Sequence, residues 1–79
     1  MFIRKLRPDE RALGTADRIY LDRLERGNIS WTGSVVVAGK EVFGASSAGF
    51  ATILEAETDA IAWARRHGAT DLQIEGPHS

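Results

Sequence analysis

The chain has 79 residues, with 10 Lys and Arg against 11 Asp and Glu, a formal net charge of −1 and no cysteine. This length fits a single small domain spanning residues 1–79. The lack of cysteine excludes disulfides, thiolate metal sites and a cysteine nucleophile. No apolar run approaches the roughly 20 residues of a transmembrane helix, and the N-terminus lacks the apolar stretch of a secretory signal. We therefore expect a cytoplasmic protein that does not enter a membrane.

The charges are segregated along the chain. Residues 1–26 carry seven basic and five acidic side chains, whereas residues 27–54 carry only Lys40 and Glu41. Residues 55–79 carry five acidic and two basic side chains. The weakly charged middle is typical of strands, and the near-neutral total argues against a general nucleic-acid coat.

The first eight residues predict either an edge strand or a mobile basic arm. Phe2, Ile3 and Leu6 are apolar, and cations stand between and after them. An arm of this kind is a candidate contact for nucleic acid or for an acidic partner. The alternative is a solvated terminus, because acidic residues follow at once. The cations of the candidate arm are Arg4, Lys5, Arg7 and Arg11.

Residues 8–26 fit two interpretations. Leu13, Ala16, Tyr20 and Leu24 have helical spacing, but Gly14 interrupts that helix at a cost of about 1 kcal/mol. The other interpretation is a helical turn near residues 9–13, a strand over 18–25 and a turn at 26–28. We favour the strand.

Residues 29–38 and 41–48 predict a β-hairpin. Gly39-Lys40 fits a two-residue turn with glycine at its first central position. The register that follows pairs Val37 with Val42, Val36 with Phe43 and Val35 with Gly44. One face of the hairpin is then apolar, includes Trp31, and should pack against a helix.

The other face of the hairpin is small, rich in hydroxyls and carries one apolar pair. It is either an ordinary solvated sheet face or a protein interface, homodimeric or with a larger protein. The residues of this candidate protein-binding face are Ser30, Thr32, Ser34, Val36, Phe43 and Ser47.

Residues 53–67 predict an amphipathic helix. Thr52 followed by Glu55 has the spacing of a capping box, and Gly68 fits the C-terminal cap. Acidic residues cluster in the first turns and basic ones in the last, which complements the helix dipole. We interpret these carboxylates and His67 as dipole partners rather than as metal ligands or a general base. Residues 70–75 alternate apolar and polar side chains and predict a last strand.

These elements predict an α+β fold, a two-layer sandwich in the order β-β-β-α-β. An antiparallel three- to four-stranded meander would carry one main helix packed on one face.

The segment from Phe50 to Ile74 resembles the first helix and following strand of ribonuclease H-like domains. It is also similar to the helix after the three-stranded sheet in HicB-type antitoxins, which carry a reduced version of that fold. The resemblance implies metal-binding carboxylates at Asp22, at Glu55 or Glu57, and after the last strand. Only Glu75 stands near that last position, and the usual Asp is missing. The resemblance therefore favours a binding module over a metal nuclease.

We expect a small non-enzymatic protein-interaction module of bacterial or phage origin, antitoxin-like or inhibitor-like, without a cofactor or a bound metal. Its partner would be another protein or further copies of itself. One alternative is a nucleic-acid-binding protein that uses the N-terminal cations. The other is a degenerate ribonuclease H-like metal enzyme.

Overall fold

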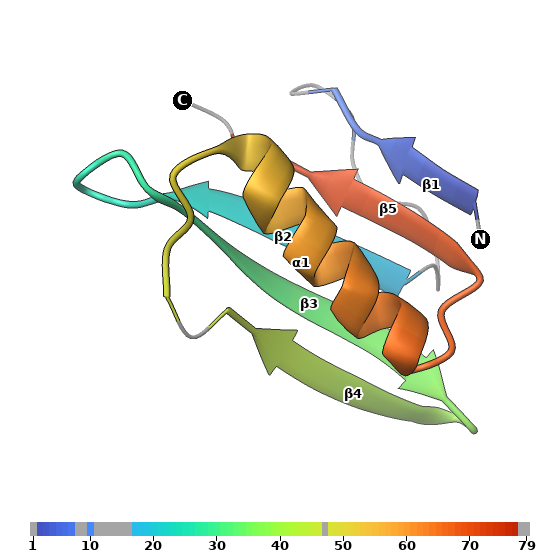
Figure 1. Cartoon of the computed structure of the whole chain (residues 1–79). Helices are drawn as coiled ribbons and strands as arrows, with labels where there is room; N and C mark the ends of the chain where they lie inside the picture. Colours follow the sequence, from blue (N-terminus) through green and yellow to red (C-terminus); the bar gives the residue numbers. More distant parts are fainter. Residues whose placement is uncertain (1, 8–9, 11–16, 47, 78–79) are drawn as a thin grey trace.

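In the part of the chain that the structure describes, five strands form one mixed β-sheet, and a single helix covers one face of it (Figure 1). The computed structural model describes residues 2–7, 10, 17–46 and 48–77. The elements in chain order are β1 (Phe2–Lys5), β2 (Asp17–Arg23), β3 (Ile29–Val37), β4 (Lys40–Ala45), α1 (Ile53–Arg66) and β5 (Asp71–Glu75). The predicted α+β class with one main helix is confirmed. Within the described residues, no helix is both long enough and apolar enough to cross a membrane.

The strand interpretation of the ambiguous region is confirmed. In β2, Ile19 and Leu21 are buried while their neighbours are more exposed, which is the two-residue alternation of a strand. Phe2–Lys5 likewise forms a strand at the sheet edge rather than a free arm. The helical turn near residues 9–13 lies almost entirely outside the described residues.

The β3–β4 hairpin forms with a register different from the expected one. Ala38 and Gly39 occupy its turn with φ angles of 51° and 78°, and two positive φ angles in a row are typical of a type I′ turn, which suits the twist of a hairpin. The observed register pairs Val37 with Lys40, Val36 with Glu41, Val35 with Val42 and Ser34 with Phe43. The slip is two residues, an even number, so every side chain keeps its predicted face.

Both ends of α1 are capped by the residues that the sequence predicts. The Thr52 hydroxyl accepts a hydrogen bond from the Glu55 amide at 3.2 Å. At the other end, Gly68 has a φ of 85°. Its amide donates to the Arg65 carbonyl at 3.1 Å, and the Ala69 amide donates to the Ala64 carbonyl at 3.0 Å. These two bonds define a Schellman motif.

The sheet is larger than expected and only partly antiparallel. Its strand order is β1-β5-β2-β3-β4. β5 pairs in parallel with both β2 and β1, whereas the other pairs are antiparallel. The two hairpin turns reverse the chain twice, so β4 runs in the same direction as β2. The helix α1 then returns the chain to the end of the sheet where β2 begins, so β5 also runs parallel to β2. Because β3 already pairs with one edge of β2, β5 adds to the other edge.

The core lies between α1 and the sheet. It is built from small helix residues facing large strand residues. The fully buried members on the two sides are Ala56, Ala60 and Ala64 of α1 and Ile19, Val35 and Leu72 of the strands. The small alanines let the helix approach the sheet closely.

Candidate protein-binding face

The open face is the sheet surface that points away from α1, and it contains the predicted binding residues. Ile19, Leu21, Trp31 and Val35 of β2 and β3 point toward the helix. Strand alternation therefore turns the predicted residues the other way. The described members of the predicted set are Ser30, Thr32, Ser34 and Val36 of β3 and Phe43 of β4. Ser47 lies outside the described residues.

A hollow of about 330 Å³ opens on this face. Its volume lies at the lower end of the range seen for ligand and side-chain pockets. The residues that line it are Tyr20, Thr32, Gly33, Ser34, Phe43 and Gly44. Because the two glycines carry no side chain, backbone forms part of the lining.

Two large apolar side chains of β3 and β4 stand exposed on the open face. Phe43 is 72% exposed and Val36 is 50% exposed. Phe43 pairs directly with Ser34, and Val36 lies two residues further along β3. An exposed aromatic ring beside a hollow is the arrangement that anchors many protein interfaces.

Charged groups of opposite sign lie on the two sides of the hollow. Arg18 of β2 donates from Nη1 to the hydroxyl of Tyr20 at 3.4 Å. On β4, the carboxylate of Glu41 accepts a hydrogen bond from Ser34 Oγ at 2.5 Å. Because Tyr20 and Ser34 both line the hollow, the two bonds hold a cation at its β2 side and an anion at its β4 side.

The open face is not equally accessible across its width. Gln73 of β5 pairs with Arg18, so it points to the open face, yet it is only 7% exposed. Phe43 and Val36 on β4 and β3 are at least half exposed. The accessible surface beside the hollow therefore lies over β3 and β4, and at the other edge of the face Phe2 of β1 is 81% exposed.

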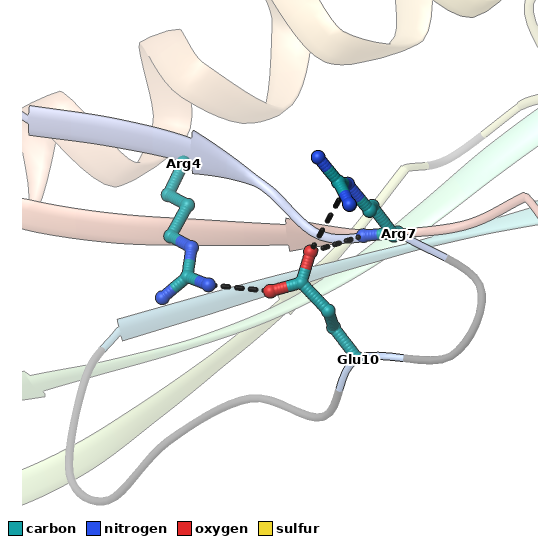
Figure 2. A network of polar contacts seen from close by, with 3 residues as sticks. All are labelled: Arg4, Arg7 and Glu10. Atoms are coloured by element: carbon teal, nitrogen blue, oxygen red, sulfur yellow. Dashed lines mark hydrogen bonds and ion pairs between the residues drawn. The ribbon is translucent and has the colours of Figure 1, made fainter.

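Arg4 and Arg7, two of the N-terminal cations, contact Glu10 (Figure 2). The Arg4 guanidinium binds one carboxylate oxygen. The Arg7 backbone amide donates to the other oxygen at 3.1 Å. The backbone amide of Arg7 is the main cause that lowers the pKa of Glu10, and the positive charges of Arg4 and Arg7 lower it further.

Lys5, the third described cation, points to the helix side of the sheet. Its Nζ lies 3.0 Å from an oxygen of Glu57, whose side chain is only 8% exposed. The two N-terminal arginines thus contact Glu10 on the open face, whereas Lys5 contacts Glu57 on the helix side of the sheet. Arg11 lies outside the described residues. The described part of the predicted basic arm is a paired edge strand.

The helix carboxylates and the strand carboxylates that the ribonuclease H resemblance singles out lie on opposite sides of the sheet. Glu55 accepts a hydrogen bond from the Thr52 hydroxyl at 3.0 Å, and Glu57 pairs with Lys5. Asp22 pairs with Ser30 in the sheet and so belongs to the open face, opposite to α1. The described residues contain no group of three His, Asp or Glu side chains able to hold a metal ion.

Tyr20 lines the hollow and Glu41 bonds to Ser34 at its edge, but no sequence pattern pointed to either residue. The pairing of Tyr20 with Thr32 across β2 and β3 places it on the open face, and this pairing could not be assigned while β2 was ambiguous. Glu41 sits beside Ser34 only because of the two-residue slip in the hairpin.

Comparison of the chain with protein-family models, with curated proteins and with solved structures finds no match.

Proposed function

We propose that this protein is a non-enzymatic module that binds a protein partner through the exposed part of its open face. The observation that carries the proposal is Phe43, an aromatic side chain 72% exposed beside an apolar hollow. Leaving such a ring in water forgoes about 1.5–3 kcal/mol of transfer free energy. A partner that covers it recovers that free energy on binding.

The surroundings of Phe43 have the composition of a small interface. Thr32 and Ser34 supply hydroxyl groups beside the apolar surface of Val36. Interfaces commonly combine an apolar centre with a hydrogen-bonding rim. The order β2–β3–β4–α1–β5 agrees with the β-β-β-α-β order of the HicB-type resemblance, with β1 as an addition. This agreement in the order of elements supports an antitoxin-like or inhibitor-like mode of action, in which the protein acts by binding its partner.

The test is capture of partners from a lysate of the source organism by the immobilised protein. Val36→Glu places a charge on the open face at an exposed position, where folding should tolerate it. Leu54→Glu is the matched control, because Leu54 is 71% exposed but lies on α1, on the opposite side of the sheet. We expect a protein that is retained by the wild type and by Leu54→Glu and lost with Val36→Glu. Equal retention by all three would refute an open-face site.

A further inference from the structure

The exposed part of the open face has the features of a surface that is complementary to itself. In the register of the sheet, Arg18 of β2 and Phe43 of β4 both pair with Ser34 of β3. Glu41 lies two residues from Phe43 along β4, and the hollow lies between Phe43 and Tyr20. Around Ser34 the face therefore has a cation on one side of β3, and an anion and an exposed ring on the other. Asp22 and Glu75 lie further along the β2 side of the same face.

A twofold axis that runs along β3, between two facing copies, exchanges these sides. β4 of one copy then lies over β2 of the other. Because Phe43 and Arg18 both pair with Ser34, Phe43 of each copy is carried over Arg18 of the other copy, at the β2 side of its hollow. Glu41 of each copy lies two residues further along the strand direction, within reach of the long Arg18 side chain. The same contacts form twice, which is the defining property of an isologous interface.

We infer that the partner recognised by the open face is a second copy of this chain, bound face to face across β3. The inference rests on the proposed function, since it names the occupant of the same site. A cavity of about 150 Å³ is enough to hold a benzene ring, so a hollow of about 330 Å³ accommodates the Phe43 ring. The Arg18 guanidinium adds an attraction to the incoming aromatic ring and to Glu41.

The association should be weak. The accessible surface covers mainly two strands, and interfaces below about 1,200 Å² in total are typical of transient complexes. We therefore expect dissociation in the micromolar to millimolar range, with the two charge pairs deciding orientation more than affinity.

Charge reversal across the interface gives a direct test by sedimentation equilibrium between roughly 10 μM and 1 mM at low salt. In a homodimer of Arg18→Glu, both symmetry-related charge contacts bring two carboxylates together. In a homodimer of Glu41→Arg, both bring two guanidinium groups together. An equimolar mixture of the two variants restores two opposite-charge pairs. We expect the wild type and the mixture to form dimers, and each variant alone to be monomeric or at least tenfold weaker.

Control variants separate loss of the contact from loss of the fold. Glu25→Arg makes the same charge change at an exposed position of the β2–β3 turn and should dimerise like the wild type. Arg18→Glu removes the bond to the Tyr20 hydroxyl, so the double variant Arg18→Glu/Glu41→Arg provides a second restoration. Phe43→Ala should weaken the dimer with all charges unchanged. The dispersion of each amide spectrum reports folding.

Two results would overturn the inference. One is a wild type that stays monomeric up to 1 mM. The other is a mixture that associates no better than its components while both are folded. Either result leaves the proposed function standing if Val36→Glu still abolishes capture of a different protein. The proposed function itself would be refuted if the Val36→Glu variant captured partners as well as the wild type does.

Discussion

Trp63 shows how single residues fix the distance between the helix and the sheet. Gly33 and Gly44 pair directly across β3 and β4. A Cβ atom added to Gly44 would lie 2.4 Å from the Trp63 ring, and one added to Gly33 would lie 2.6 Å from it. The indole therefore packs on bare backbone. It also contacts Trp31 with ring centroids 5.2 Å apart, and the Trp31 Nε1 donates to Asp59 at 2.8 Å.

Substitution of Gly44 by alanine should destabilise the protein by about 1–3 kcal/mol, the usual cost of overpacking. The cause is steric, because only Trp63 atoms lie within 2.6 Å of the new methyl group. Urea unfolding of the wild type and the variant measures the change. In a double-mutant cycle, Trp63→Leu should reduce the penalty of Gly44→Ala. Additive effects of the two substitutions would contradict this account.

At the scale of elements, one ion pair joins β1 to α1. Glu57 is nearly buried on the helix, and the Lys5 ammonium at the sheet edge lies 3.0 Å from one of its carboxylate oxygens. β1 also pairs in parallel with β5. At the two ends of this pairing, the Phe2 amide donates to the Thr70 carbonyl and the Leu6 amide donates to the Ile74 carbonyl. The strand is short and its four residues are exposed, so the side-chain pair is an important part of its attachment.

Replacing Lys5 by methionine should destabilise the protein by about 1–3 kcal/mol, because a buried carboxylate loses its partner. Glu57→Gln should cost less, since an amide still accepts a hydrogen bond from Lys5. Arg23→Met is the control, because Arg23 is an exposed cation in β2. Thermal or urea unfolding distinguishes the three variants. An equal loss for Lys5→Met and Arg23→Met would contradict a specific role for the pair.

The sequence allowed the elements to be predicted better than their pairing. The ends of α1 are marked by Thr52 and Gly68, and the local bonds that they make depend on neighbours within a few residues. The register of the hairpin depends on whether Gly39 is the first or the second residue of the turn. The sequence favoured the first position, whereas the structure has Gly39 second, after Ala38.

The candidate site shows the same division between local and long-range information. Alternation along β3 and β4 was enough to place Ser34, Val36 and Phe43 on one face. The hollow also needs Tyr20, whose position follows from the pairing of β2 with β3. Lys5 and Glu57 are 52 positions apart in the chain, and no local pattern announces such a contact.

On the scale of the whole molecule, stability should decrease from the centre of the sheet to the β1 edge. β5, β2 and β3 are interior strands, and Ile19 and Leu72 are fully buried. β1 is an edge strand with all four residues exposed. Segments with few buried contacts open with a lower free energy than the core.

Amide hydrogen exchange should therefore be slowest at Ile19 and Leu72 and fastest, among the strands, in β1. The comparison is restricted to amides that are hydrogen-bonded within the sheet, so that local bonding does not decide the order. In Lys5→Met, exchange in β1 should accelerate more than exchange in β2. Protection of β1 equal to that of β2 would show that the edge strand opens only with the whole domain.

The position of β5 has a consequence for how the chain is made. β5 lies between β1 and β2 in the sheet but follows both in the sequence, so β1 has no neighbour in the sheet until β5 has left the ribosome. Until then β1 is unattached, and β2 presents an open parallel edge to any strand that passes. The emergence of β5 is thus the step that closes the sheet, and a chain stopped before Asp71 would keep its hairpins but lack the strand that joins β1 to the rest.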